Sequence, residues 1–450
     1  MITVMKFGGT SVGSAEAIQR VANIIINTEG EKVVVASAMS GITNFLVAAV
    51  DGPTLDVDSV VEQFANKHLM AAEQMFDEKT MAEFKKDFDE RIKFFRKSLE
   101  GDQNDAYYKD LITSQGERFS TLMLSHYLRM LGHDSVALTA ETAGIAAVGL
   151  PLSGSADLIA TASGMTMKVR PLLSQGIIPV ITGFYGIKDG VPLTFGRGGS
   201  DYSAAVVANA LDANMLEIWT DVDGFMTADP RIIKDAIKID EMTFGEAAEL
   251  AYFGAKVLHP RTIEPVRIKH IPLKVRNSFR PEEPGTLIHN LRRKSKGLLK
   301  SVATKNDLAI ITISSAEIAY RPEMTAAIIN KIAEDNIIIY SISTSLSTIA
   351  MLISNSDVTT VIRKLNELSS GEIERIDVKN NVSLICCVGD DLLSKCGVTG
   401  DIFTAVKEAG VNVEMISEGA SEVSLNFVVP MSMVMDVVAV LHAEYIGESE

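Results

Sequence analysis

The sequence has little of what marks several large classes of protein. Three cysteines, Cys386, Cys387 and Cys396, are too few and too clustered for a disulfide framework, and no Cys/His spacing suits zinc. No uninterrupted apolar run reaches the ~18 to 20 residues that cross a bilayer. Lys6 and two glycines interrupt the only early apolar run, which argues against a secretory signal. We therefore expect a reduced, cytoplasmic setting and no membrane partner.

Positive charge is also scarce. Lysine and arginine number 42 and aspartate and glutamate number 58, so the formal net charge at pH 7 is −16. Such a charge opposes the counterion release that drives binding to DNA and RNA, and we expect no nucleic-acid partner. The length of 450 residues exceeds one ordinary hydrophobic core, so two or three domains are expected.

The segment "MKFGGTSVGS" near the N-terminus predicts a strand, a tight turn and a helix. An apolar strand, Ile2 to Met5, leads into it, and a helical pattern begins at Ser14. Gly8 and Gly9 would bring bare backbone N–H groups close to an anion, and Lys6 would add a full charge. The same residues could form a plain strand-to-helix connection, and the Walker sequence places its lysine after the glycines.

Strand and helix patterns alternate from residue 1 to about 290. The strand candidates are "EKVVVASA", "SVALTA", "GIIPVITGF", "LEIWTDV" and "IPLKVRN". This alternation predicts an α/β fold, a three-layer αβα sandwich with a mainly parallel sheet, which binds ligands at the carboxyl ends of its strands. The helical tract from Val57 to Leu99 would be either a lid or, as we prefer, a solvated helical pair that covers the sheet edge.

Beyond this region the sequence repeats itself. Met324 to Met351 aligns without gaps with Val398 to Leu425, and each copy is typical of a small α+β module. Such modules usually pair through sheet edges, so we expect a homodimer or homotetramer. The predicted segments are a first domain at 1–290, a linker at 291–305, and modules at 306–380 and 381–450.

The loop "TFGRGGSDYSAA" contains residue types that would hold the two ends of an amino acid. Arg197 lies among three glycines, and Ser200 and Asp201 stand where an alanine-rich helix begins. The planar arginine suits a carboxylate and the aspartate suits an ammonium group. Asp201 could instead merely cap the helix, but that interpretation explains neither the arginine nor the glycines.

Four further segments place polar or charged side chains after predicted strands or at helix starts. They read "ASAMSGITN", "SQGER", "WTDVDGFMTADPR" and "FGAKVLHP". Each alone could be an ordinary turn or cap, but together they suit a pocket for a nucleotide and a small charged acceptor. Their candidate residues are Ser37, Thr43, Glu117, Thr220, Asp221, Arg231 and Lys256.

The order and spacing of these motifs resemble the aspartate kinases of the amino-acid kinase family. "KFGGTSVGS", "SQGE", "TFGRGGSDYSAA", "WTDVDGFMTADPR" and "FGAKVLHP" all match, and the tandem repeat resembles the family's pair of ferredoxin-like ACT regulatory modules. The resemblance implies transfer of the γ-phosphoryl of ATP, with Mg²⁺, to the β-carboxylate of L-aspartate. The product, 4-phospho-L-aspartate, would lead to lysine, threonine and methionine.

The resemblance also implies a role for each matching residue. Lys6 and Asp201 would be catalytic, with Lys6 at the transferring phosphate, whereas no motif implies the Mg²⁺ ligands. L-Aspartate would contact Ser37, Thr43, Glu117, Arg197, Ser200 and Asp201. ATP would contact Lys6, Phe7, Gly8, Gly9, Thr220, Asp221, Met226, Arg231, Lys256 and Val257.

Elementary chemistry agrees with these roles. The acceptor carboxylate, with a pKa of ~4, is already ionised near neutrality, so no general base is required. What remains is to bring two anions together and to stabilise charge on the phosphoryl group, for which lysine, backbone amides and Mg²⁺ are suited. A free substrate ammonium would explain why the carboxylates of Glu117 and Asp201 stand in a pocket otherwise built for anions.

Two features depart from the family's pattern. Met226 stands where many relatives carry tyrosine, so thioether packing would replace a ring contact with the nucleotide. Lysine-sensing relatives tend to place acidic groups where Tyr340 and Leu346 stand here, which makes lysine feedback through the first module doubtful. The alternatives are a different amino-acid effector, use of the second module through Glu414 to Glu422, or no feedback.

Two other functions stay open from the sequence alone. A kinase of glutamate, acetylglutamate or a nucleoside monophosphate would share the sheet, but such enzymes generally lack the paired ACT modules. An amino-acid sensor with a dead kinase domain is disfavoured by the intact Lys6, Asp201 and Lys256. We expect no fused dehydrogenase, because the second repeat extends almost to Glu450.

Overall fold

The apolar N-terminal segment forms β1 (Ile2–Phe7), which leads into the glycine turn at Gly8 and Gly9. The sequence predicted that this strand ends at Met5. It continues to Phe7 because its backbone pairs in parallel with β2 (Glu31–Ala36) on one side and with β9 (Met215–Thr220) on the other. Partners on both sides explain why every residue of β1 is buried.

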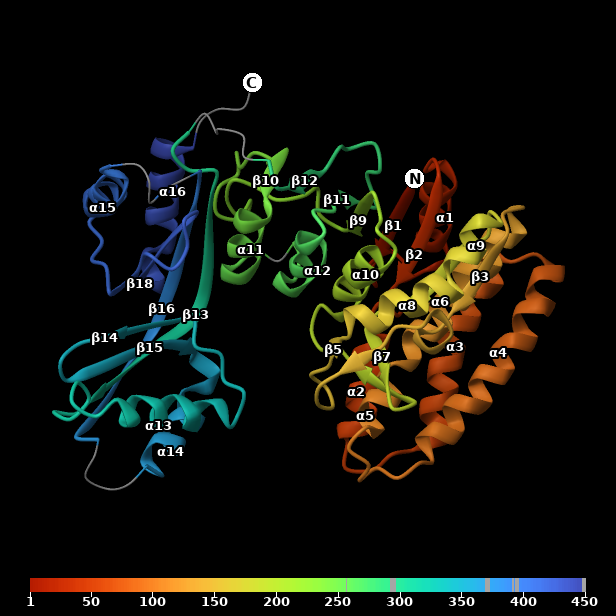
Figure 1. Cartoon of the computed structure of the whole chain (residues 1–450), viewed down its shortest axis with the longest axis horizontal. Coiled ribbons are helices and arrows are strands. Elements are labelled where there is room, and N and C mark those ends of the chain that lie inside the picture. The colour runs from red at the N-terminus through yellow and green to blue at the C-terminus, as the bar shows by residue number, and fades with distance from the viewer. Residues whose placement is uncertain (256, 292–296, 369–372, 391, 393–395, 447–450) are drawn as a thin grey trace. The chain divides into compact units, whose positions relative to one another are not determined.

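The computed structural model describes residues 1–255, 257–291, 297–368, 373–390, 392 and 396–446. The described part of the chain divides into two units (Figure 1). The first unit comprises Met1–Phe225, Asp240–Ala247 and Lys256–Leu291, and the second comprises Met226–Ile239, Ala248–Ala255 and Arg292–Glu450.

Within the described residues, eight strands form the main sheet of the first unit. Their order is β10-β12-β11-β9-β1-β2-β6-β3, and all neighbours are parallel except β11 and β12. Each of the five strand segments expected after the first contains one of these strands, so the mainly parallel sheet is confirmed. The further bounds are β3 (Ser135–Leu138), β6 (Ile178–Thr182), β10 (Glu241–Thr243), β11 (Leu273–Asn277) and β12 (Thr286–His289), with two hairpins, β4 (Ala147–Val148) with β5 (Ser155–Ala156) and β7 (Tyr185–Lys188) with β8 (Val191–Thr194).

Helices cover both faces of this sheet, which confirms the three-layer αβα sandwich (Figure 1). Met5 and Phe7 of β1 point into a core shared with α1 and α6, whereas Lys6, between them, reaches α10 on the other face, as the alternation of side chains along a strand requires. The helix bounds are α1 (Ala15–Asn27), α2 (Ile42–Asp51), α3 (Val57–Met75), α4 (Glu78–Leu99), α5 (Tyr108–Thr113), α6 (Gln115–Met130), α7 (Ala140–Ala143), α8 (Leu158–Lys168), α9 (Arg170–Ser174), α10 (Gly199–Ala210), α11 (Phe244–Phe253) and α12 (Ile263–Ile268).

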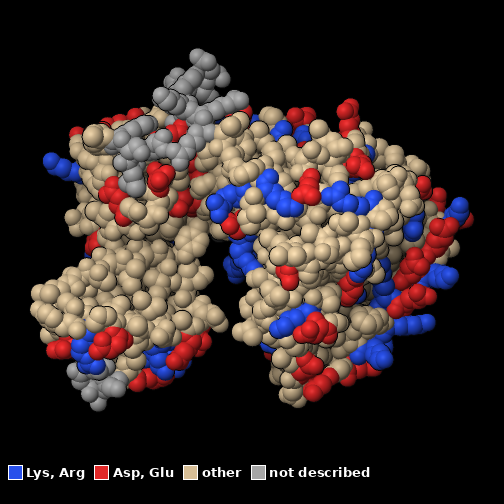
Figure 2. Space-filling model, viewed as in Figure 1, with Lys and Arg blue, Asp and Glu red and all other residues tan. Residues whose placement is uncertain are grey.

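The expected helical pair is confirmed as α3 and α4, but it packs on α6 and not on the sheet edge. Phe64 of α3 is 0% exposed and lies among the rings of Phe95 and Phe119. The outer side of the pair is solvated. Figure 2 shows side chains of both charge signs mixed along the edge where Figure 1 places α4.

Six strands form the sheet of the second unit, counted over its described residues. Their order is β14-β15-β13-β16-β18-β17 and all pairs are antiparallel. The two α+β modules expected from the repeat are confirmed. The bounds are β13 (Ser301–Ser314), α13 (Pro322–Ala333), β14 (Ser341–Thr344), β15 (Thr348–Ser354), α14 (Val358–Asn366), β16 (Arg375–Val388), α15 (Val398–Glu408), β17 (Met415–Ser417), β18 (Ser424–Pro430) and α16 (Val434–Tyr445).

The long strands β13 and β16 belong to both modules. The second half of β13 pairs with β15 of the first module, whereas Ser301 to Lys305 pair with the half of β16 that lies beside β18. A shift in register between Lys305 and Leu308 separates the halves. The predicted linker, 291–305, therefore differs from the structure at its end, where the chain forms a strand of the second module's sheet; residues 292–296 lie outside the described residues.

The segment Met226–Ile239 is part of the second unit, although it precedes the repeat by many residues. The Val302 amide donates to the Thr227 carbonyl at 2.9 Å, and the Ser301 hydroxyl donates to the Met226 carbonyl at 2.8 Å. Ala228 joins the hydrophobic core of the second module. Strand β13 thus holds this segment through its backbone.

Among the helices of the described residues, none is long and apolar enough to cross a membrane.

We predict that Phe64→Ala lowers the free energy of unfolding by about 3–5 kcal/mol, because truncating a fully buried ring leaves a cavity. Urea denaturation followed by circular dichroism measures the change. Met70→Ala on the same helix is the matched control: Met70 is 60% exposed, so its loss should change stability by less than about 0.5 kcal/mol. Equal midpoints for the two variants would contradict the core position of Phe64.

Candidate active site

The glycine turn after β1 lies against the loop that follows β2. The Ser40 amide donates to the Gly9 carbonyl at 3.1 Å, and the Gly8 amide donates to the Trp219 carbonyl at 3.2 Å. A Cβ atom at Gly9 would lie 3.0 Å from the Ala38 carbonyl oxygen, closer than side chains normally approach. The glycine therefore permits the contact between the two loops, and the predicted strand, turn and helix are confirmed, with Ser14 as the N-cap of α1.

Lys6 and Asp201 form an ion pair at the centre of the site. The Lys6 Nζ lies 2.5 Å from Asp201 Oδ1, and the two side chains are 9% and 17% exposed. Lys6 projects from the face of β1 that α10 covers, and Asp201 lies in the first turn of α10. The pair fixes the position of the ammonium group where β1 ends.

Glu117 is a buried carboxyl group at the start of α6. Its Oε1 accepts from the Ala38 amide at 3.1 Å, while Oε2 has no hydrogen-bond partner among the described residues. Burial raises the pKa of Glu117 to about 8, although the Ala38 hydrogen bond and the charge of Lys6 oppose the rise. A cation placed beside Oε2 would favour the ionised form.

Arg197 lies exposed at the tip of the loop between β8 and α10. Gly196 and Gly198 on either side of it have φ of 72° and 71°, in the left-handed region that favours glycine. A Cβ atom at Gly198 would lie 2.3 Å from the Cβ of His259, so this glycine also permits close packing. The loop conformation depends on these glycines, and it presents the guanidinium at the cavity described below.

Two residues that the sequence analysis missed anchor this loop. The buried Asp110 carboxylate accepts from the Thr194 amide at 2.6 Å, from the Thr194 hydroxyl and from the Leu152 amide. Arg261 donates to the Phe195 carbonyl at 2.9 Å and to the Gly154 carbonyl at 2.9 Å. Asp110 lies in an unremarkable helical pattern and its partners are backbone groups distant in sequence, so no motif could have revealed it.

One cavity of about 500 Å³ gathers most of the predicted residues at the carboxyl ends of β1, β2 and β9. All of the residues assigned to L-aspartate line it: Ser37, Thr43, Glu117, Arg197, Ser200 and Asp201. From the ATP set, Lys6, Gly8, Gly9, Thr220 and Asp221 line it as well. The sequence analysis did not single out Thr10, Met39, Asn44 and Phe184, which also line the cavity, although all but Phe184 fall within its motifs.

The other residues assigned to ATP are not brought to this cavity. The Phe7 side chain is fully buried beneath the site, with its ring stacked 6.0 Å from the ring of Trp219, so only its backbone is near the turn. Met226 and Arg231 belong to the second unit, where Arg231 pairs with Asp229. Val257 is not among the described residues that line the cavity, and Lys256 lies outside the described residues.

Comparisons with known proteins agree with the motifs. A model of the amino acid kinase family matches residues 1–277, and a model of the ACT domain matches residues 385–445. The chain is 33% identical to lysine-sensitive aspartokinase 3 of Escherichia coli, with 98% of each chain covered. It is 32% identical to chloroplastic aspartokinase 2 of Arabidopsis thaliana, covering 98% of this chain and 84% of that protein. It spans about half the length of the bifunctional aspartokinase/homoserine dehydrogenase 2 of Zea mays.

Solved structures give the same result. The structure of E. coli aspartokinase III in complex with aspartate and ADP (R-state) superposes with a TM-score of 0.84 at 32% identity, covering 98% of this chain and 99% of that one. The same enzyme in complex with lysine and aspartate (T-state) also gives 0.84, at 31% identity. The family model covers more than half of the chain, and the relatives match it almost from end to end. The chain therefore belongs to the amino acid kinase family, among its aspartokinases.

Proposed function

We propose that the protein transfers the γ-phosphoryl group of ATP to the β-carboxylate of L-aspartate, giving 4-phospho-L-aspartate and ADP. The observation that supports this most directly is the single cavity that Lys6 shares with all the residues assigned to L-aspartate. The similar E. coli enzyme was solved with aspartate and ADP, the substrate and product that this reaction requires.

The two ends of L-aspartate would contact opposite charges in the cavity. Arg197 offers a planar guanidinium to the α-carboxylate. Glu117 offers the ammonium its Oε2, the oxygen without a hydrogen-bond partner among the described residues. The sequence analysis shared the ammonium between Glu117 and Asp201, but Asp201 is already paired with Lys6. We therefore assign the ammonium to Glu117 and assign Asp201 to positioning Lys6.

At the other end of the substrate, Lys6 would neutralise charge on the transferring phosphoryl group. The β-carboxylate is the nucleophile and is ionised without help, so the protein's task is to hold it in line and to reduce the repulsion between two anions. The fixed Lys6 ammonium serves that purpose, together with the Gly9 amide; the Gly8 amide already donates to the Trp219 carbonyl and is not the bare donor that the sequence suggested. Lys6 therefore acts as an electrostatic catalyst and not as a nucleophile.

ATP would contact Thr220 and Asp221, which line the cavity, and the resemblance also assigns Met226, Arg231, Lys256 and Val257 to it. The described residues contain no cluster of three or more His, Cys, Asp or Glu that would hold a metal alone. Mg²⁺ usually takes one or two protein carboxylates and completes its shell with phosphate oxygens and water. Asp221, exposed at the cavity, fits that requirement. Bound Mg²⁺ would offset the negative charge of the phosphates.

We propose that the predicted division of the chain holds in function, with kinase domain 1–290 and regulatory modules 306–380 and 381–450, and that copies of the chain associate through the modules. Strands β14 and β17 are the two edges of the second sheet. Ile342 and Ile416, at equivalent positions of the repeat, are 43% and 47% exposed on these edges. Apolar edge strands of this kind are suited to pairing with another copy.

Tyr340 and Leu346 stand in the first module at the positions where lysine-sensing relatives tend to place acidic groups. The Nζ of Lys305 lies 4.4 Å from the ring centroid of Tyr340, so a cation of the protein already occupies that face. Leu346 is 68% exposed and carries no charge. In the second module, Glu414 is paired with Lys379. These contacts favour an effector other than lysine, or none.

We expect Lys6→Ala to lower kcat by several orders of magnitude, because it removes the charge nearest the transferring phosphoryl group. A hydroxamate assay with L-aspartate and Mg-ATP measures turnover. Lys188→Ala, in the β7–β8 hairpin away from the cavity, is the control and should retain activity. Near-normal turnover of Lys6→Ala would refute the assigned role, and an inactive natural sequence with retained aspartate binding would indicate a sensor.

Arg197→Ala should raise KM for L-aspartate by about 10- to 100-fold with a smaller effect on kcat, because a charge-assisted hydrogen bond contributes ~1.5–3 kcal/mol. Arg197→Lys keeps the charge but not the planar guanidinium, so its KM for L-aspartate should lie between that of the natural sequence and that of Arg197→Ala. Steady-state kinetics at saturating Mg-ATP supply both values. An unchanged KM in Arg197→Ala would show that the α-carboxylate binds elsewhere.

The kcat/KM for L-aspartate should rise between pH 7 and pH 9. The pKa of Glu117 is raised to about 8 in the free protein, so its carboxyl is mostly protonated at pH 7, and only the ionised form attracts the substrate ammonium. Since kcat/KM reports the free enzyme, the apparent pKa should be near 8. In Glu117→Gln this rise should disappear, with kcat/KM low throughout; a profile identical to that of the natural sequence would exclude Glu117 as the titrating group.

Lysine at millimolar concentration should leave the rate unchanged. Parallel assays with threonine and with methionine identify an effector if one of them acts. Inhibition by lysine would contradict this prediction. If lysine also inhibits the Lys305→Ala variant, the Tyr340 region does not determine the response to lysine.

A further inference from the structure

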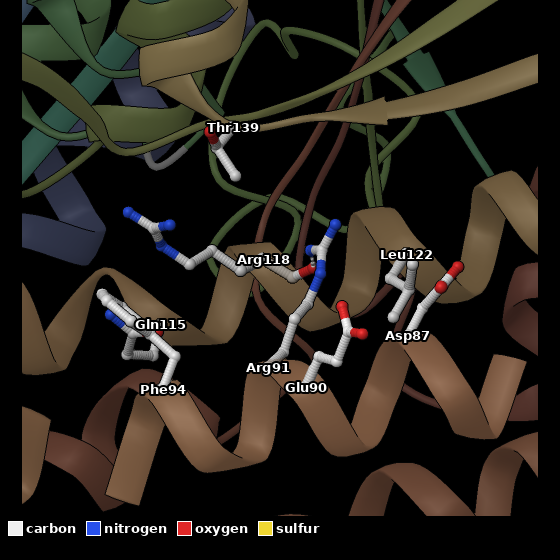
Figure 3. Close-up of a pocket in the computed structure, with 8 residues that line it drawn as sticks. All are labelled: Asp87, Glu90, Arg91, Phe94, Gln115, Arg118, Leu122 and Thr139. Carbon is white, nitrogen blue, oxygen red and sulfur yellow. Dashed lines mark hydrogen bonds between the residues drawn. The ribbon is translucent and has the colours of Figure 1, made fainter. Parts of the chain in front are cut away.

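A second cavity of the first unit lies between α4 and α6 and is separate from the proposed active site. Its volume is about 360 Å³. On α6, Gln115, Arg118 and Leu122 line it at spacings of three and four residues, which places them on one face of the helix; Glu117, on another face, lines the active-site cavity. The two cavities share no described lining residue. The other lining residues, drawn in Figure 3, are Asp87, Glu90, Arg91 and Phe94 of α4, together with Thr139.

The cavity contains the Arg91 guanidinium, which forms no ion pair with a described residue, although the charges of Asp87 and Glu141 are close enough to favour its charged form. Figure 3 shows Arg91 rising from α4 toward α6, where its Nη1 donates to the Arg118 carbonyl. Among the described residues Arg118 forms an ion pair with Glu141, whereas Arg91 forms none. Burial and the neighbouring charge of Arg118 lower the pKa of Arg91 to about 10. An anion in the cavity would relieve both effects.

Two further polar atoms lack partners on the same side of α6. Arg118 Nε is a buried donor and Gln115 Oε1 is a buried acceptor, and neither has a hydrogen-bond partner among the described residues. The Gln115 amide is oriented by the bond from its Nε2 to the Leu111 carbonyl at 2.9 Å. Because buried polar atoms in proteins are nearly always paired, an occupant is expected to supply both an acceptor and a donor.

The cavity also offers an apolar wall. Phe94 is 47% exposed although its neighbour Phe95 is fully buried, and Leu122 faces the cavity from α6. Together, the exposed Phe94 ring and the half-buried Arg91 guanidinium suit a small molecule with one charged end and one apolar end.

We propose that the cavity between α4 and α6 binds a small α-substituted carboxylate of the α-amino acid class, with Arg91 as its cationic anchor. The carboxylate accepts from Arg91 and Arg118 Nε, the α-amino group donates to Gln115 Oε1, and a short apolar side chain packs on Phe94. α-Hydroxy acids share this chemistry in part, because a hydroxyl can also donate to Gln115.

Calorimetric titration of the full chain, without ATP, tests the proposal with four probes of equal length: L-norvaline, L-2-hydroxypentanoate, pentanoate and L-norvalinamide. We expect L-norvaline to bind, norvalinamide to bind at least tenfold more weakly because it lacks the carboxylate, and pentanoate to bind more weakly because it lacks the donor. If hydroxypentanoate binds more tightly than norvaline, the α-amino class is wrong. Equal affinities for norvaline and norvalinamide, or no binding of any probe, would overturn the site.

Variants place the binding in this cavity. Arg91→Met should weaken norvaline binding about 10- to 100-fold, as expected for one charge-assisted hydrogen bond, and Arg91→Lys should restore part of it. Lys93→Met, an exposed position on the same helix, is the matched control and should bind normally. Phe94→Ala, which leaves the Arg91 bond to the Arg118 carbonyl intact, should also weaken binding. Unchanged binding in both Arg91→Met and Phe94→Ala would overturn the proposal, and because no turnover is measured, this result is independent of the kinase assay.

Discussion

The ion pair between Lys6 and Asp201 is the contact on which the site depends. It joins the central strand of the sheet to the first turn of α10, so the turn after β1 and the loop before α10 cannot move independently. A lysine with so little solvent exposure needs a nearby anion, because an isolated charge is costly to bury. Asp201 supplies that anion in the free protein, and the arriving phosphates would share the same ammonium.

The rest of the site's geometry follows from the parallel strands, whose carboxyl ends lie at the same edge of the sheet. Parallel strands place their carboxyl ends together, which brings the glycine turn, the Ser37 loop and Thr220 to one cavity. Ionisable groups of both kinds lie around it: the Lys6 ammonium, the Arg197 guanidinium and the Glu117 carboxyl. Under the proposed function, a zwitterionic acceptor with a second carboxylate would meet a partner at each of its three charges, which would explain why carboxyl groups are present in a site for two anionic reactants.

Local signals allowed most of the kinase fold and its acceptor site to be predicted from the sequence. Strand periodicity and glycine turns act over a few residues, so the sheet, the turn after β1 and the Arg197 loop could all be inferred. Asp110 and Arg261 could not, because each holds backbone groups at positions far away in the chain. Phe7 was assigned to ATP by its place in a motif, and alternation along β1 turns its side chain into the core, which leaves only its backbone near the turn.

The two units do not divide at one point of the chain, because Met226–Ile239 and Ala248–Ala255 belong to the second unit although they precede the predicted boundary at residue 290. Strand β13 completes the sheet of the second module although its partner strand there, β16, begins at Arg375, far along the chain, and the Met226 segment hydrogen-bonds to the same strand. A repeat in the sequence reveals two modules. It does not reveal which strands the modules share, because strand pairing depends on the backbone register between segments that are distant in the sequence. Of the residues that the motifs assign to the nucleotide, Met226 and Arg231 therefore belong, by their contacts, to the second unit. Because the Ser301 hydroxyl and the Val302 amide donate to the carbonyls of Met226 and Thr227, a change in the register of β13 would break both hydrogen bonds.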